Sequence, residues 1–122
     1  MKTNDYSTQI WELESDKITK FTISPSSFGL SPHPLSTVAG GTPTENASTL
    51  NLLLSNQLSH DNPIENFVMI NAAALLFVSG KAGSLEEGVR LARESVRSGK
   101  AEEVVKRYRD VANEEVARLG KQ

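Results

Sequence analysis

Residues 71–88 have the sequence NAAALLFVSGKAGSLEEG, which carries the strongest helix signals in the chain. The run from Ala72 to Val78 is apolar on every side, and a helix of that kind is normally central and buried. Its alanine triplet would let neighbouring helices approach closely. Gly80 ends this helix, and Ser84-Leu85-Glu86-Glu87 opens the next one with a capping box. The stretch therefore predicts two consecutive helices, the first of them buried.

Further helix signals lie on both sides of this stretch. The central helix begins at Asn62-Pro63, and Thr42-Pro43-Thr44-Glu45 opens an earlier helix with another capping box. Gly99 ends the third helix, and a last helix follows over about 101–118. We expect these inward-facing residues: Leu50, Leu53 and Leu54; Phe67, Ile70, Ala74 and Phe77; Leu85, Val89, Ala92 and Val96; Val104, Val105, Tyr108, Val111, Ala112 and Leu119.

The first 41 residues have a different pattern. Gln9–Glu14 and Lys17–Ile23 predict two strands, which the turn-forming pair Ser15-Asp16 joins into an antiparallel hairpin. Two strands alone are marginal in water, so the hairpin should belong to the edge of a larger sheet. Ser24-Pro25 then predicts a short helical turn. A loop rich in proline and glycine follows over 31–41. We therefore divide the chain into 1–41, a hairpin with a crossing loop, and 42–122, a set of C-terminal helices.

Composition narrows the class of protein. The 122 residues are 38% hydrophobic and 23% charged, which is typical of a folded domain and not of a disordered tail. The net charge of -2 argues against a nucleic-acid or anionic-membrane partner, because either would need a basic patch. No cysteine is present, and the longest apolar run is too short to span a membrane. The N-terminus lacks the apolar core of a signal peptide. We expect a cytoplasmic protein.

Few side chains have the spacing that catalysis or metal binding needs. His33 and His60 are the only histidines, and we expect both at the surface of loops. Neither has a second ligand at a metal-binding spacing. His60-Asp61 is one adjacent pair, which does not make a catalytic dyad.

Two other features have structural explanations. Gly40-Gly41 could offer backbone amides to a phosphate at a helix start, but Pro43 removes one amide, so we interpret the glycines as a hinge or tight crossing. Glu86-Glu87 and Glu102-Glu103 lie in first turns, where their charge opposes the helix dipole. From the residues alone we predict no catalytic, cofactor-binding or metal site.

A set of short motifs nevertheless resembles the late part of anthranilate phosphoribosyltransferases, of glycosyl transferase family 3. The resemblance extends from about Gln9 to the last helix, and one departure is Asp16-Lys17 where the family usually has an Asp-Gly turn. The motifs are Trp11-Glu12-Leu13, Phe28-Gly29-Leu30, Gly40 to Ala47, Asn71 to Leu75, Gly80-Lys81-Ala82, Ser84 to Gly88 and Ala92-Arg93-Glu94.

The resemblance implies an α/β parent enzyme and a known reaction. The family transfers a phosphoribosyl group from phosphoribosyl pyrophosphate to anthranilate, with magnesium, in tryptophan biosynthesis. The parent would be a homodimer, and this mostly α chain would be its sheet-edge hairpin followed by about four helices. The family's glycine-rich phosphate loop, Lys-His-Gly-Asn stretch and magnesium-holding Asp-Glu pair are not in the sequence; Asp5 is a lone acid near the place of the pair. We therefore expect a chain that is inactive alone and binds no cofactor. Its partner would be the missing N-terminal portion.

Two other interpretations stay open at this point. One is a stand-alone helical interaction module derived from the same fold. The other is a fragment of a related pyrimidine nucleoside phosphorylase. The Trp-Glu-Leu and Asn-Ala-Ala motifs favour the anthranilate enzyme over the phosphorylase.

Overall fold

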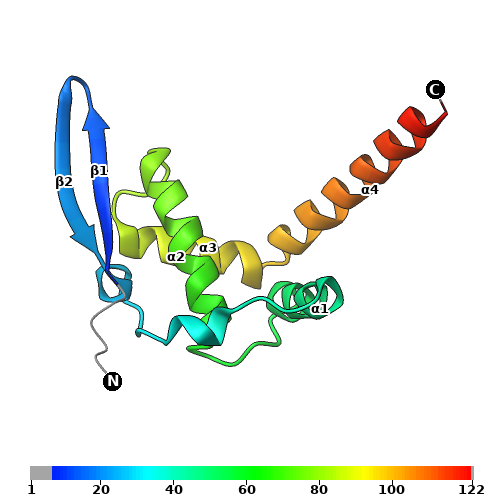
Figure 1. The fold of residues 1–122 in the computed structure, drawn as a ribbon, viewed down its shortest axis with the longest axis horizontal. Helices are drawn as coiled ribbons and strands as arrows, with labels where there is room; N and C mark the ends of the chain where they lie inside the picture. The colour runs from blue at the N-terminus through cyan, green and yellow to red at the C-terminus, as the bar shows by residue number, and fades with distance from the viewer. Residues whose placement is uncertain (1–6, 122) are drawn as a thin grey trace.

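A computed structural model describes residues 7–121 of the chain; Asp5 lies outside this range. The order of elements is a hairpin followed by helices, as the sequence predicts (Figure 1). The hairpin stands at one side, the second and third helices pack together in the middle, and the last helix projects from the opposite side (Figure 1). The elements are β1 (Thr8–Glu14), β2 (Lys17–Ile23), the 3-10 turns η1 (Pro25–Phe28) and η2 (Leu35–Val38), and α1 (Pro43–Leu54), α2 (Pro63–Val78), α3 (Leu85–Arg97) and α4 (Lys100–Gly120).

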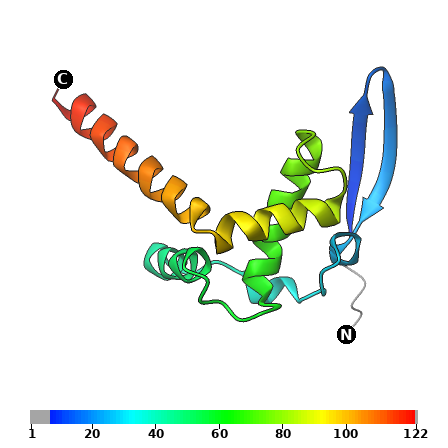
Figure 2. The same ribbon diagram turned by 180° about the vertical axis from the view of Figure 1, so that it is seen from behind.

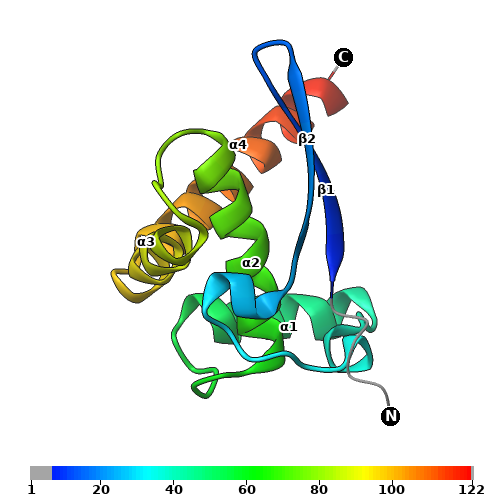
Figure 3. The same cartoon turned by 90° about the vertical axis from the view of Figure 1, so that its left-hand side faces the viewer.

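The hairpin has one apolar face that nothing in the described chain covers. Its strands pair antiparallel, with Leu13 opposite Ile18 and Trp11 opposite Lys20. Trp11 is 62% exposed, although the Lys20 ammonium lies 5.4 Å from the centre of its ring. Within residues 7–121 the sheet has only these two strands, so both outer edges are unpaired. The hairpin stands at one side of the helices in Figure 1, and its turn rises beyond the end of α2 in Figure 3. A neighbour for it must come from elsewhere.

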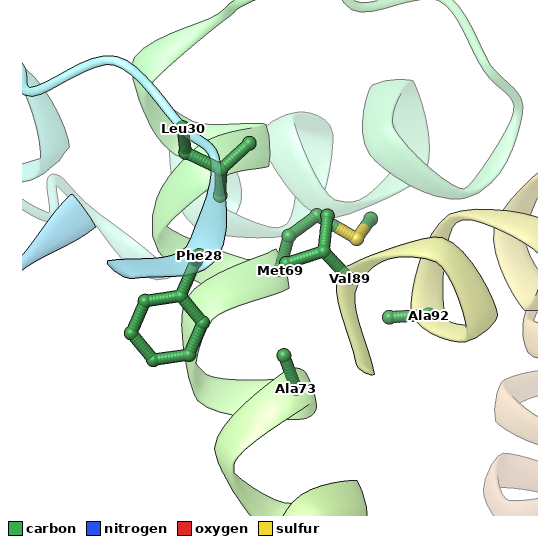
Figure 4. Close-up of a cluster of buried hydrophobic side chains, with 6 residues drawn as sticks. All are labelled: Phe28, Leu30, Met69, Ala73, Val89 and Ala92. Carbon is green, nitrogen blue, oxygen red and sulfur yellow. The ribbon is translucent and has the colours of Figure 1, made fainter. Parts of the chain in front are cut away.

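One hydrophobic core joins the two parts of the chain. Phe28 and Leu30, from the first 41 residues, pack with α2 and α3 (Figure 4). The remaining buried members of this core are Met69, Ala73, Val89 and Ala92. The division at residue 41 therefore does not separate two cores, and it stays a prediction about the parent enzyme.

The close approach of α2 and α3 depends on small residues, as the alanine triplet predicts. Ala73 is 0% exposed. A Cβ atom added to Gly88 would lie 2.8 Å from the backbone oxygen of Ala73, closer than real contacts allow. Glycine at this position therefore lets the two helices touch backbone to backbone.

The prediction that α2 is buried on all sides is wrong for this chain. Asn66, Met69 and Ala73 are its buried residues, whereas Phe67 is 47% exposed and Leu75 is 70% exposed. The predicted stripe through Phe67 is thus displaced by one residue, about a quarter of a turn, from the side that packs, and its members Ile70 and Ala74 still lie against the core. The physical reason is that α3 and η1 cover one side of α2, and the described residues leave the other side open.

The predicted inward face of the last helix is also wrong for this chain. α4 leaves α3 at Gly99, whose φ of 81° lies in the left-handed region, and then projects away from the core (Figure 2). Tyr108 is 75% exposed and Val111 is 58% exposed. The described chain offers no surface for α4 to pack on beyond its first turns. No helix in the described range is long and apolar enough to cross a membrane.

Candidate functional site

A concave site lies between the base of the hairpin and α2, and we call it the hairpin–α2 cleft. It has a volume of about 470 Å³. Its walls are mainly apolar with a few polar groups, which is typical of sites that bind a ligand or a partner segment. The hairpin contributes Thr8, Ile10 and Ile23; the turns contribute Phe28, His33, Leu35 and Val38; and α2 contributes Asn66, Phe67, Ile70, Asn71 and Ala74.

Asn66 places an unsatisfied acceptor in the wall of this cleft. Its side chain is 2% exposed, and Nδ2 donates a 2.7 Å hydrogen bond to Asp61 Oδ1. Because a carboxylate accepts only, the amide nitrogen must face Asp61, and this fixes which amide atom is the oxygen. Asn66 Oδ1 has no hydrogen-bond partner among the described residues. A buried acceptor without a donor costs roughly 1–3 kcal/mol.

His33 joins this polar group from the loop between the two turns. Its Nε2 lies 3.5 Å from Asp61 Oδ1, and its side chain is 23% exposed. The contact is within ion-pair distance, but its geometry does not make a hydrogen bond, and the nitrogen is buried without one in the described chain. His33 lies in a loop, as predicted, but it is only partly exposed and its Nε2 is buried, whereas His60 is exposed as predicted.

Asp61 is held as a carboxylate by its neighbours. The hydrogen bond from Asn66 is the main cause that lowers the pKa of Asp61, with a smaller contribution from His33 and some opposition from burial. Its backbone has a φ of 61°, a left-handed conformation that aspartate tolerates. The sequence places Asp61 beside His60, but in the fold its partners are His33 and Asn66. Of these two contacts, only the one between Asp61 and Asn66, five residues apart at the start of α2, could be suggested by local sequence.

A second depression lies along α3 and is more open. It has a volume of about 760 Å³ and is lined by three arginines and two glutamates together with η1 residues. Arg90 pairs with Glu87 at 3.6 Å and with Glu94 at 3.5 Å, and Arg93 lies 3.7 Å from Glu65. These carboxylates lie beside two of the three arginines, Arg90 and Arg93. Because this depression is the more open of the two, we favour the smaller cleft.

The backbone amides of Gly41 and Thr42, at the start of α1, are occupied. The Gly41 amide donates to Asn46 Oδ1 at 2.9 Å, and the Thr42 amide donates to Glu45 Oε2 at 2.7 Å. That Thr42 amide, followed by its hydroxyl, lowers the pKa of Glu45. Neither glycine is among the residues with positive φ, so a hinge based on glycine's backbone range is not what the structure shows. A Cβ on Gly41 would meet the Glu45 carboxylate, which is the flexible end of the side chain that accepts from the Thr42 amide.

The paired glutamates lie where the sequence places them, in the first turns of α3 and α4. Glu87 accepts a hydrogen bond from the Gly83 amide at 2.7 Å, and Glu102 pairs with Lys106 at 3.3 Å. Across residues 7–121, no three His, Cys, Asp or Glu side chains gather to hold a metal ion. The donors in this part of the chain therefore do not fit a magnesium site.

Comparisons with known proteins place this geometry in a wider context. A family model described as "Glycosyl transferase family, a/b domain" matches residues 3–102, a range that includes both sides of the expected boundary near residue 41. The anthranilate phosphoribosyltransferase of Schizosaccharomyces pombe is 49% identical over 94 residues, which are 77% of this chain and 27% of that protein. The enzyme of the same name from Haloferax volcanii is 40% identical over 94 residues, which are 28% of its length.

Solved structures agree with the sequence matches. The anthranilate phosphoribosyltransferase from Saccharomyces cerevisiae in complex with 4-fluoroanthranilate superposes with a TM-score of 0.78 at 34% identity, over 85% of this chain and 30% of that one. The same enzyme in complex with PRPP and Mg gives a TM-score of 0.74 at 35% identity. The chain thus spans less than a third of the length of these relatives.

Proposed function

The chain belongs to the anthranilate phosphoribosyltransferase family of glycosyl transferases, and we propose that it is the C-terminal portion of such an enzyme. The parent would transfer the phosphoribosyl group of phosphoribosyl pyrophosphate to anthranilate, a step of tryptophan biosynthesis, in the cytoplasm. One observation carries the proposal: the chain is 49% identical to an anthranilate phosphoribosyltransferase, yet the match spans only 27% of that enzyme's length.

The exposed apolar surfaces support this proposal. Trp11 and Leu13 on the hairpin and Leu75 and Val78 on α2 are all more than 60% exposed. Apolar patches of this kind mark surfaces that another polypeptide covers. The unpaired edges of the hairpin offer a second mode of contact, because a free strand edge accepts another strand. The partner we propose is the upstream portion of the same enzyme.

In this proposal the chain contributes scaffold and the upstream portion contributes chemistry. Phosphoribosyl transfer needs groups that stabilise developing charge on the reacting atoms. The phosphate loop and the magnesium carboxylates that the family uses have no counterpart in this sequence. We therefore propose that the isolated chain is inactive and that magnesium is held by the upstream portion. Two solved structures of the Saccharomyces cerevisiae enzyme contain bound Mg.

Reassembly of the two portions tests the proposal. The part of the Schizosaccharomyces pombe relative that precedes the matched region would be co-expressed with this chain in a tryptophan auxotroph that lacks the enzyme. We expect growth, and magnesium-dependent pyrophosphate release from anthranilate and phosphoribosyl pyrophosphate, only when both portions are present. Each portion alone is the control. Pyrophosphate release by this chain alone would show that its predicted inactivity is wrong.

The alternative of a helical interaction module is favoured by one observation, the exposed apolar residues along α4. If both portions are abundant yet neither co-purify nor support growth, the module is the better description. The relatives and solved structures described above are anthranilate enzymes, and they favour that enzyme over a nucleoside phosphorylase. The homodimer expected for the parent stays a proposal.

A further inference from the structure

We propose that α4 pairs with the α4 of a second copy of this chain, and that the two helices run antiparallel about a two-fold axis near residue 111. The inference goes beyond the proposed function, because it concerns a contact between copies and not the reaction or the upstream portion. Three features of α4 lead to it: a bare apolar face, two charge blocks of opposite sign, and charged side chains that have no ion-pair partner in the described chain.

The apolar face runs along most of α4. Val104, Tyr108 and Val111 follow one another at spacings of four and three, and Val105 and Ala112 lie next to them on the same side. Tyr108 is 75% exposed, Val111 is 58% exposed, and no residue of α4 is buried. An apolar stripe on one side of a helix is the surface by which two helices pack. In a monomer this stripe faces water.

Little in the described chain approaches this face. The described element that α4 contacts most is α3, which it follows directly, and the rest of α4 projects from the side opposite the hairpin (Figure 1). At 1.5 Å per residue α4 is about 30 Å long, so it offers a second helix several turns of contact. The family model ends at residue 102, whereas α4 continues to Gly120. The apolar face therefore lies outside the part of the chain that the family model describes.

The charges in the middle of α4 are sorted into two blocks that complement each other. Residues 104–109 (VVKRYR) carry three basic side chains and no acidic one, and residues 110–115 (DVANEE) carry three acidic side chains and no basic one. An antiparallel pair places the basic block of each copy beside the acidic block of the other, whereas a parallel pair would place like charges together. This self-complementary pattern is what a two-fold symmetric contact between identical chains requires.

Arg107 and Glu114 lie on either side of the proposed axis. Neither takes part in an ion pair within the described chain, where the pairs of α4 are Lys106–Glu102, Arg109–Asp110 and Arg118–Glu115. The two residues are equally far along the helix from a point between residues 110 and 111. Antiparallel pairing about that point sets Arg107 of each copy beside Glu114 of the other.

The test measures the mass of the full chain in solution over a range of concentrations, by sedimentation velocity. We expect a monomer–dimer equilibrium that shifts toward the dimer as the concentration rises. Val111→Glu should weaken dimerisation by about tenfold or more, because it places two carboxylates together at the axis. Val78→Glu is the matched control, since it makes the same change at a valine of α2 that is 79% exposed, and it should leave dimerisation unchanged. Neither valine belongs to the core, so both variants should melt as the parent does in dilute solution.

Charge reversal tests the orientation of the pair. Arg107→Glu and Glu114→Arg should each weaken dimerisation by about tenfold, because each replaces two attractive contacts between copies by two repulsive ones. Combining both changes in one chain exchanges the signs and should restore most of the affinity. In a parallel pair the combined variant would gain nothing, since like charges would still lie together. Hydrogen exchange gives an independent readout: residues 104–120 should exchange fast in the dilute monomer and become protected as the dimer forms.

The outcomes separate this inference from the proposed function. A chain that stays monomeric at millimolar concentration, or dimers that Val111→Glu leaves intact, would overturn the inference. A combined charge variant that dimerises no better than the single ones would show that the antiparallel arrangement is wrong. If α4 becomes protected only after the upstream portion is added, the occupant is that portion and not a second copy. A monomeric chain that restores activity with the upstream portion would overturn this inference and leave the proposed function standing.

Discussion

At the scale of single residues, Gly88 shows how one missing atom sets the packing of two helices. The contact could be anticipated in kind, because the alanine triplet in the sequence predicts a close approach. That Gly88 is the residue opposite Ala73 could not be anticipated. The rotation of α3 about its own axis decides which of its residues faces α2, and that rotation depends on the whole core. The polar group of His33, Asp61 and Asn66 was missed for a similar reason. His33 meets Asp61 only through tertiary folding.

We expect Gly88→Ala to destabilise the chain. The new Cβ would lie 2.8 Å from the backbone oxygen and 2.9 Å from the Cα of Ala73, and backbone atoms cannot move aside as a flexible side chain can. Overpacking of this kind costs roughly 1–3 kcal/mol, which is partly offset by about 1 kcal/mol of improved helix propensity. Thermal unfolding should show a Tm several degrees lower. Gly120→Ala, where an added Cβ meets nothing within 4 Å, is the control. Equal Tm values for the two variants would contradict the packing described.

Asp61 should give the chain an acid-sensitive contribution to stability. Its pKa is lowered in the folded chain, chiefly by the hydrogen bond from Asn66, so folding favours the ionised carboxylate. This contribution is complete above the carboxyl's ordinary pKa of about 3.9 and is lost as the pH falls through the lower folded-state value. The difference in Tm between the parent and Asp61→Asn should therefore shrink below about pH 4. A difference that stays constant from neutral pH to pH 2 would rule out this linkage.

At the scale of elements, the sequence predicts the existence and limits of the helices well because their caps are local. Thr42, Asn62 and Ser84 each accept a hydrogen bond from a backbone amide of the helix that they precede. The buried side of each helix is less predictable. An all-apolar helix such as α2 carries no pattern that selects one side, so its neighbours decide. For α4 the pattern is amphipathic, but its apolar side has no cover in the described chain.

We expect α4 to be the least stable helix of the isolated chain. Most of the stability of a helix in a protein comes from tertiary packing of its apolar face, and α4 has little of it. Val105 is 38% exposed and Tyr108 is 75% exposed, so little apolar burial holds it. Hydrogen exchange followed by mass spectrometry should show fast exchange over 104–120 and slow exchange in α2 and α3. Tyr108→Ser should change the free energy of unfolding by less than about 0.5 kcal/mol. Protection of α4 equal to that of α2 would show that it packs on something.

At the scale of the whole molecule, the chain has one small core and several surfaces that a larger protein would cover. The sequence predicts this because its motifs resemble the late part of a longer enzyme. The hairpin–α2 cleft could not be predicted, since its walls come from three separate regions of the chain. Its acceptor on Asn66 has no signature in the sequence beyond an asparagine in a helix. An asparagine at the same position of an exposed helix face would have the same sequence pattern.

Trp11 provides a direct measure of how these surfaces are covered. It is the only tryptophan of the chain and is 62% exposed. Its fluorescence should have the long-wavelength maximum of a solvated indole in the isolated chain. Association with the upstream portion should shift the maximum to shorter wavelength if the hairpin joins a sheet. The signal is taken as the difference between the parent and Trp11→Phe, because the partner can carry tryptophans of its own. Association without any shift would place the hairpin outside the interface.

The backbone contact between Gly88 and Ala73 also has a mechanical consequence. Two helices separated by long side chains can slide past each other as those side chains change rotamer. Here the crossing point has no such layer, so α3 cannot translate along α2 without a backbone collision. The remaining freedom of α3 is rotation about this contact. A movement of α4 would therefore change the crossing angle between α3 and α2, with residue 88 as the pivot.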